Sequence, residues 1–381
     1  MSSLTDLCRY PIVQAPMAGG TSSPRLVAAV ADAGGLGFLA AGYKSAEEMR
    51  QEIDQVRAAT AGAFGVNLFM PQPPPADPGA AAAYRDRLAA EADTYGIPLG
   101  DPDPDGGDGS DGSDGFDGSD GRDGSDGFDG SDGFDAKVAA LLAEPVPVVS
   151  FTFGCPTRDT LDAFARAGTY TIVTVTTAEE ARDAQWAGAD AVCAQGVEAG
   201  GHQSTHHDDP RADHTGIGLL TLVTQVRETV QLPVVAAGGI MRGAQIAAVL
   251  AVGADAAQLG TAFLACPESG AHPLHKQALT SPMFVRTALT RAFSGRPARG
   301  LVNRFVREHD PYAPAAYPQV HRVTSGLRKA AARAGDAQSM ALWAGQGHRM
   351  ARELPAGELV GLLAAELSET AGPAVGMRSE Q

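Results

Sequence analysis

The chain has 381 residues, which is long enough for one large barrel with an appendage. Its formal net charge is −16, and residues 101–135 supply −12 of this through thirteen aspartates and one basic residue, Arg122. No part has the basic stripe that nucleic acids or anionic membrane surfaces require, so we expect neither as a partner.

The first residues, MSSLTDLCRYP, lack the basic and apolar regions of an export signal. No apolar run reaches the length of a membrane-spanning helix. Four widely spaced cysteines without a Cys-x-x-Cys pair fit reduced thiols better than disulfides or a zinc site: Cys8, Cys155, Cys193 and Cys266. We therefore expect a cytoplasmic protein.

Short apolar runs alternate along the chain with segments of helical period, which is typical of a parallel sheet covered by helices. One such helical segment, SPRLVAAVADAGG, has Ser23 as a cap, Pro24 in the first turn and Gly34 at the end. The predicted strands are Pro11–Pro16, Leu36–Ala41, Phe64–Phe69, Pro147–Phe153, Tyr170–Thr176, Ala191–Gly196, Pro233–Gly239 and Ala256–Thr261. Eight units predict an α/β fold, the (β/α)8 TIM barrel. A doubly wound open sheet is the alternative, because periodicity does not show closure.

The predicted organisation is a barrel over residues 1–270, interrupted by an Asp/Gly-rich insertion at 101–135, and a C-terminal helical extension over 271–381. The insertion lies between helical segments at 80–95 and 135–143, so removing it leaves the strand count unchanged. Its charge and low hydrophobicity predict disorder. We expect deletion of residues 103–133 to leave activity intact.

The insertion repeats the triplet Gly-X-Asp from residue 109 to residue 135, which raises the alternative of a calcium-binding module. Calcium β-rolls use nine-residue repeats, and the EF-hand loop ends in a glutamate that this stretch lacks. A disordered acidic loop therefore fits the pattern better than a calcium fold does.

Catalysis in such barrels takes place at the carboxyl ends of the strands. The first strand ends at Met17 and is followed by small residues, which allow a flat ligand to approach the backbone. The third strand carries Asn67, which is either a ligand contact or a core amide with its hydrogen bonds satisfied. The sixth ends in QGVEAGGH, where Gly200 and Gly201 place the imidazole of His202 as a candidate general base.

The last two strands end in glycines, which present backbone N–H groups to a phosphate. These are Gly238 and Gly239 after the seventh strand and Gly260 after the eighth, where the Thr261 hydroxyl adds a donor. The loop after His202, QSTHHDDPRADH, lacks the spacing and helical frame of a metal site. We expect a phosphate-bearing cofactor and no metal.

In these motifs the chain resembles the nitronate monooxygenases over nearly its whole length outside the insertion. The resemblance rests on QAPMAGG at 14–20, AGGLGFLAAGY at 33–43, GVNLF at 65–69, QGVEAGGHQ at 195–203, AAGGI at 236–240, GADAAQLGTAFLACPES at 253–269, SGRPARGLVNRF at 294–305 and LWAGQG at 342–347. It implies a barrel that binds FMN without a covalent bond. The flavin contacts that it implies are Met17, Asn67, Gln195, Gly200, Gly239, Gln258, Leu259, Gly260 and Thr261.

The resemblance also implies that alkyl nitronates are oxidised by dioxygen to carbonyl compounds and nitrite, with neutral nitroalkanes as a further candidate substrate class. His202 would then either abstract a proton from a neutral nitroalkane or, when protonated, stabilise the nitro oxygens. The alternative is an FMN-dependent enoyl-acyl-carrier-protein reductase using NADH, although SGRPARGLVNRF and LWAGQG favour the monooxygenase. We expect a monomer or a homodimer.

Overall fold

The computed structural model describes residues 4–102, 131–208 and 216–371. Eight parallel strands form its central sheet, in the order β1–β9–β8–β6–β5–β4–β3–β2. They are β1 (Ile12–Gln14), β2 (Gly37–Ala40), β3 (Phe64–Phe69), β4 (Val148–Thr152), β5 (Tyr170–Val175), β6 (Ala191–Gln195), β8 (Val234–Ala237) and β9 (Ala256–Leu259). Each predicted strand is present, and most are shorter than predicted by one to three residues.

The first and last strands of this order, β1 and β2, meet and close the barrel. Val13 and Leu36 form a parallel bridge, and the Gln14 N–H donates to the Leu36 carbonyl at 2.9 Å. The Phe38 N–H donates to the side-chain oxygen of Gln14 at 3.0 Å, which gives this buried backbone group a partner. The fold is therefore the predicted (β/α)8 barrel, and the open sheet is excluded.

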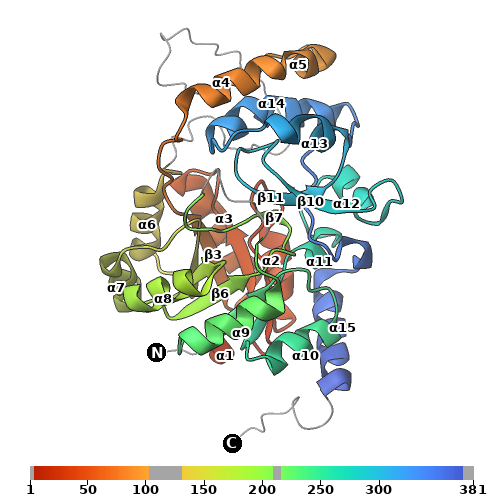
Figure 1. Cartoon of the computed structure of the whole chain (residues 1–381). Helices are drawn as coiled ribbons and strands as arrows, with labels where there is room; N and C mark the ends of the chain where they lie inside the picture. Colours follow the sequence, from red (N-terminus) through yellow and green to blue (C-terminus); the bar gives the residue numbers. More distant parts are fainter. Residues whose placement is uncertain (1–3, 103–130, 209–215, 372–381) are drawn as a thin grey trace, which may run out of the picture.

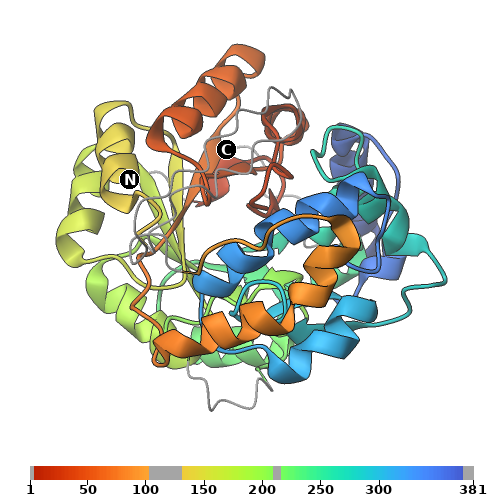
Figure 2. The same ribbon diagram turned by 90° about the horizontal axis from the view of Figure 1, so that it is seen from above.

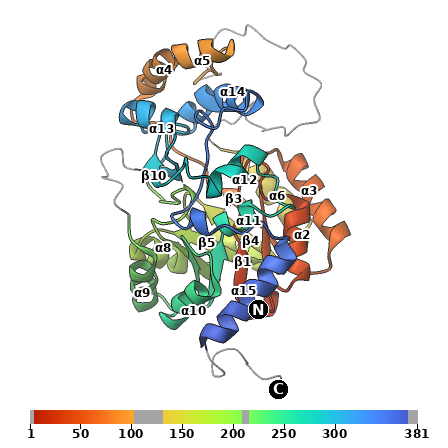
Figure 3. The same cartoon turned by 90° about the vertical axis from the view of Figure 1, so that its right-hand side faces the viewer.

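Helices surround the barrel on its outer side (Figure 1). Most begin at a side-chain cap: Ser23 accepts the Leu26 N–H before α2, and Ser45 forms a capping box with Glu48 before α3. These helices are α2 (Pro24–Asp32), α3 (Ala46–Ala59), α6 (Phe134–Ala143), α7 (Arg158–Arg166), α8 (Ala178–Ala187), α9 (Leu219–Thr229) and α10 (Gly243–Ala251). The C-terminal helix α15 (Ala356–Ala371) packs between α10 and α2 and completes the ring (Figure 3).

A second layer covers one end of the barrel, seen from above in Figure 2. It combines the helices before the insertion, α4 (Pro78–Arg87) and α5 (Ala89–Tyr95), with α13 (Arg304–His309) and α14 (Gln319–Arg333) from the C-terminal part. A three-stranded antiparallel sheet lies below them, in the order β10 (Thr287–Thr290), β11 (Ala298–Leu301) and β7 (Gly201–His202). The C-terminal extension thus contains the predicted helices and two short strands that the sequence did not indicate.

The connecting segments include the short helices α1 (Leu4–Leu7), α11 (Thr261–Leu264) and α12 (Pro273–Thr280), and the 3-10 turns η1 (Asp310–Tyr312) and η2 (His348–Met350). Among the described residues, no helix has the length and apolar character needed to cross a membrane. All four cysteines are free, and burial raises the pKa of Cys193 to about 12, so this thiol stays protonated.

The insertion lies mostly outside the described residues, and with it the predictions of disorder and of calcium binding in residues 103–130. The structure describes where the chain returns from it, at Ser131, before α6 begins at Phe134. Asp132 is buried there, in an ion pair with Lys137. Deletion of residues 103–133 would therefore remove one partner of a buried ion pair, and its effect on activity stays a prediction.

Candidate active site

A cavity of about 890 Å³ lies between the carboxyl ends of the barrel strands and helix α14. All twelve residues that the sequence identifies as a base or as cofactor contacts line this cavity. They lie in or just after five barrel strands, which are β1, β3, β6, β8 and β9. The volume is that of a pocket for a cofactor or small molecule.

Glycines form one wall of the cavity at the ends of β8 and β9. Gly238 and Gly239 have φ angles of 142° and 67°, which side-chain-bearing residues rarely adopt. Gly260 follows β9, and the Thr261 hydroxyl accepts the Gly345 N–H at 2.9 Å, which leaves its own proton to donate. A wall of backbone and one hydroxyl donor fits the phosphate of a nucleotide-type cofactor.

Two amide side chains are fixed by hydrogen bonds around the cavity. Asn67 donates from Nδ2 to the hydroxyls of Ser150 at 2.9 Å and Thr152 at 3.0 Å, so its oxygen is the group left for a ligand. Gln195 donates to the His202 carbonyl at 3.0 Å and accepts the Ser204 N–H at 2.8 Å. Asn67 is thus a bonded amide at the pocket wall, and Gln195 shapes the loop that carries His202.

His202 is held in place by the small antiparallel sheet. It lies opposite Ala298 of β11, and its Nε2 shares a hydrogen bond of 2.9 Å with the Ser294 hydroxyl. Ser294 also donates to the Arg296 carbonyl at 3.2 Å. When it does so, Nε2 is the donor to Ser294, and Nδ1 keeps the lone pair that accepts a proton.

Aromatic rings enclose the imidazole of His202. Phe153, Tyr317 and Trp343 have ring centroids 5.7, 5.7 and 5.6 Å from it. Burial among these rings lowers the pKa of His202 to about 3, and the positive charges of Arg296 and Arg328 act in the same direction. The imidazole is therefore neutral at physiological pH.

Arg296, which contributes to this shift, is itself buried. Its guanidinium lies 4.1 Å from the centroid of the Phe153 ring and donates to Gln72 at 2.6 Å and to the Thr205 carbonyl. This arginine therefore links the segment after β3, which holds Gln72, to the loop after His202, which holds Thr205. It also fixes a positive charge near His202.

Several pocket residues were not identified from the sequence. Tyr43 and Trp343 belong to the motifs AGGLGFLAAGY and LWAGQG, which carried the family resemblance without a role for these rings. Their motif membership was the available signal. On α14, His321, Arg328 and Lys329 also line the pocket, and these three residues were not identified from the sequence, which predicted only a C-terminal helical extension.

The polar loop after His202 has structural contacts in its described part, residues 203–208. The His206 ring bonds the Thr174 carbonyl at 2.9 Å, and Asp208 forms a two-point ion pair with Arg291 at 2.6 Å for both contacts. Three further polar residues of this loop, Asp209, Asp213 and His214, lie outside the described residues.

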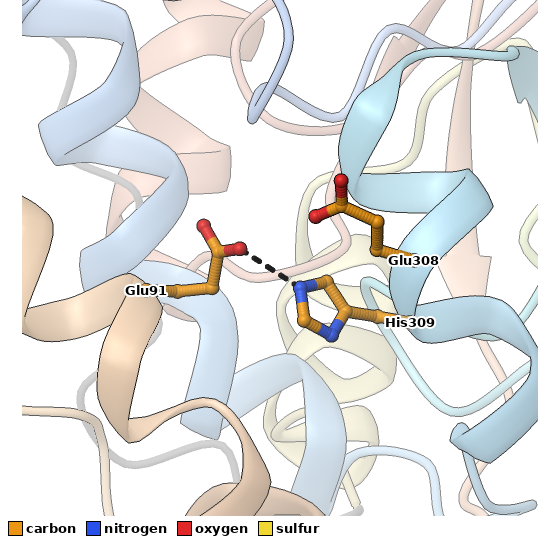
Figure 4. A group of neighbouring side chains, drawn as sticks. All are labelled: Glu91, Glu308 and His309. Atoms are coloured by element: carbon orange, nitrogen blue, oxygen red, sulfur yellow. Dashed lines mark hydrogen bonds and ion pairs between the residues drawn. The ribbon is translucent and has the colours of Figure 1, made fainter.

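One group of side chains has the spacing of metal ligands: Glu91, Glu308 and His309, with ligand atoms within 4.8 Å of one another (Figure 4). Arg304 already neutralises it, because its guanidinium contacts Glu91 at 2.5 and 2.7 Å and Glu308 at 2.6 Å. His309 donates a further bond of 2.9 Å from Nε2 to the Glu91 carboxylate. The group is therefore an ion-pair network that joins α5 to α13.

Comparisons with known proteins cover nearly the whole chain. The family model for nitronate monooxygenase matches residues 1–366. A nitronate monooxygenase from Pseudomonas aeruginosa is 41% identical over 364 residues, covering 94% of this chain and 96% of the relative. The crystal structure of nitroalkane oxidase from Streptomyces ansochromogenes is 65% identical, with a TM-score of 0.88 and coverage of 97% and 99%. FabK from Thermotoga maritima is 28% identical, with a TM-score of 0.70 and coverage of 97% of both chains.

Proposed function

Because the chain belongs to the nitronate monooxygenase family, and is thus an oxidoreductase, we propose that it oxidises alkyl nitronates with dioxygen to carbonyl compounds and nitrite. The similar nitroalkane oxidase supports neutral nitroalkanes as further substrates. The observation that carries the proposal is the pocket in which the glycine ends of β8 and β9 and the neutral His202 share one cavity.

FMN is the proposed cofactor, and it would supply the electron-accepting and dioxygen chemistry that side chains lack. Gly238, Gly239, Gly260 and Thr261 would hold its phosphate, because they offer backbone N–H groups and a hydroxyl proton at neighbouring strand ends. The contacts to the remainder of the cofactor would come from Met17, Asn67, Gln195, Gly200, Gly201, Gln258 and Leu259.

His202 is the proposed catalytic residue. Since its pKa is lowered to about 3, its neutral form is the one present during turnover, and this form can accept a proton from a bound nitroalkane. The protonated form that would stabilise the nitro oxygens is disfavoured by burial and by two arginines. Between the two roles that the sequence left open, the base role is therefore the better supported.

The test is purification of the full chain, its visible absorption spectrum, and oxygen uptake with ethyl nitronate compared with NADH alone. We expect a flavin spectrum, nitronate-dependent oxygen uptake and nitrite release. A colourless protein that FMN does not reconstitute would contradict the proposal. Rapid anaerobic bleaching of the flavin by NADH, without nitronate turnover, would favour the reductase instead.

We further propose a cytoplasmic location, which the free state of all four cysteines supports. The partners would be the nitronate and dioxygen, acting on a monomer or a homodimer. Size-exclusion chromatography with light scattering distinguishes the two assembly states.

A further inference from the structure

The acidic insertion ends in a buried ion pair that the proposed chemistry does not use. Asp132, near the end of the Gly-X-Asp repeat, lies 2.7 Å from Nζ of Lys137 on α6. The side chains are 3% and 1% exposed. Charges that are removed from water in this way need well-placed partners, because desolvation opposes their burial. The other contacts of the pair therefore indicate what it stabilises.

Both ions also bond the backbone of one short turn after β2. The ammonium of Lys137 donates to the Ala41 carbonyl at 2.9 Å, and Oδ1 of Asp132 accepts the Tyr43 N–H at 2.9 Å. Tyr43 has a φ angle of 66°, a left-handed conformation that side-chain-bearing residues adopt only when their surroundings impose it. The ion pair thus fixes the turn from both sides.

This turn directs the Tyr43 ring into the wall of the pocket. The ring stacks on His321 of α14, with centroids 4.3 Å apart and planes 10° from parallel, and its hydroxyl accepts a bond from Tyr317 at 3.1 Å. At Gly42 a Cβ would lie 2.3 Å from the Phe69 ring, so the turn has no room to shift inward. The orientation of Tyr43 therefore depends on the backbone that the ion pair holds.

We propose that Asp132 and Lys137 are positioning residues for Tyr43, and that through it they hold helix α14 against the pocket. Asp132 then has a positioning role, which differs from the solvent-facing charge that the composition of the insertion suggests. The inference rests on the proposed function only for its kinetic readout.

The experiment is a double-mutant cycle in the full-length holoenzyme with Lys137→Met and Tyr43→Ala. We expect Lys137→Met to raise KM for ethyl nitronate about tenfold with kcat little changed, as is typical of coupled neighbouring residues. In the Tyr43→Ala background the same substitution should change KM less than about twofold, because the ring to be positioned is gone. Equal effects in both backgrounds would overturn the proposal and leave a purely structural ion pair.

A conservative variant and a matched control make the test specific. Asp132→Asn keeps an oxygen that can accept the Tyr43 N–H. We therefore expect Asp132→Asn to raise KM less than Asp132→Ala does. Lys44→Met is the control, because Lys44 follows Tyr43 directly and its ammonium pairs with Glu52 at 2.6 Å, while its backbone N–H, which donates to the Ala41 carbonyl at 3.3 Å, is kept in the variant. If Lys44→Met raised KM for ethyl nitronate as much as Lys137→Met does, a specific role of the Asp132–Lys137 pair would be contradicted.

Two further readouts need no turnover. Hydrogen exchange of the Tyr43 amide in the apoprotein should be slow and should accelerate in Asp132→Ala. The same double-mutant cycle is also measured with the dissociation constant for FMN, by fluorescence quenching. We expect Lys137→Met to change this constant less in the Tyr43→Ala background than in the wild type. If the wild type fails to oxidise nitronates, these measurements still decide the inference, and fast exchange of the Tyr43 amide in the wild type would overturn it.

Discussion

The pH dependence of nitroalkane turnover tests the environment of His202 directly. A histidine with the ordinary pKa of 6.5 loses its neutral form as the pH falls, whereas burial lowers the pKa of His202 to about 3. Because the shift is downward, the neutral and proton-accepting form stays populated throughout the range from pH 7 to pH 5. The rate that depends on this base should therefore not fall as the solution becomes acidic.

The size of the effect follows from the two pKa values. Between pH 7 and pH 5 the neutral fraction of an ordinary histidine decreases about 25-fold, while that of a histidine with a pKa of about 3 decreases by about 1%. We expect kcat/KM for nitroethane to vary less than about twofold over this interval.

The assay is steady-state oxygen uptake with nitroethane, with each enzyme sample checked for bound FMN at every pH. His202→Asn is the control, and we expect it to reduce nitroethane turnover at all pH values while FMN binding is retained. A logarithmic slope of one below pH 6.5 in the wild type would show that His202 titrates normally and would refute the argument from burial. Unchanged turnover in His202→Asn would remove this residue from the base role.

Three other predictions concern the surroundings of the site. Removing the hydroxyl that bonds His202, in Ser294→Ala, should reduce kcat/KM about fivefold without weakening FMN binding, since such a bond contributes about 1 kcal/mol; equal kinetics would mean that Ser294 does not orient the imidazole. Because Arg328 and Lys329 line the pocket, kcat/KM for anionic ethyl nitronate should fall severalfold from about 0.05 M to about 0.5 M salt, while that for nitroethane stays constant; replacing both by Gln should abolish this dependence. Replacing residues 103–130 by a Gly/Ser segment of equal length should preserve nitronate turnover. Replacing residues 103–133 in the same way should raise KM for the nitronate about tenfold, because Asp132 is lost. Identical kinetics of the two variants would show that Asp132 is dispensable.

The barrel could be predicted from the sequence because its strands are buried on both faces. Every residue of Phe64–Phe69 and Tyr170–Val175 is buried, so each strand appears as a short, nearly continuous apolar run between helical segments. The glycines after β8 and β9 mark the strand ends, and strand ends are where such barrels bind ligands. Closure between β1 and β2 could not be predicted from the sequence, because it depends on the backbone hydrogen bond between Gln14 and Leu36 where the two strands meet.

The sequence predicted a helical extension packed on the barrel, but not which residues would cover the pocket, because these parts are brought together only by tertiary contacts. β10 and β11 have the sequences TALT and ARGL and β7 has two residues, so none of them forms an apolar run like those of the barrel strands. Helix α14 has an ordinary amphipathic sequence, and its role depends on its packing against α4 and α5. Asp132 is one of nine aspartates in near-identical triplets, so only its contact with Lys137 distinguishes it.

The neutral imidazole and the basic helix together favour one ionisation state of the proposed substrate. General bases work best when their pKa lies near the operating pH, so a His202 with a pKa of about 3 is a weak acceptor for a carbon-bound proton. A nitronate has already lost that proton, and its negative charge is attracted by Arg328 and Lys329 on the same pocket. A neutral nitroalkane gains little from these cations and depends on the weak base. We therefore expect the protein to prefer nitronates over nitroalkanes, because of the burial of one histidine and the charge of one helix.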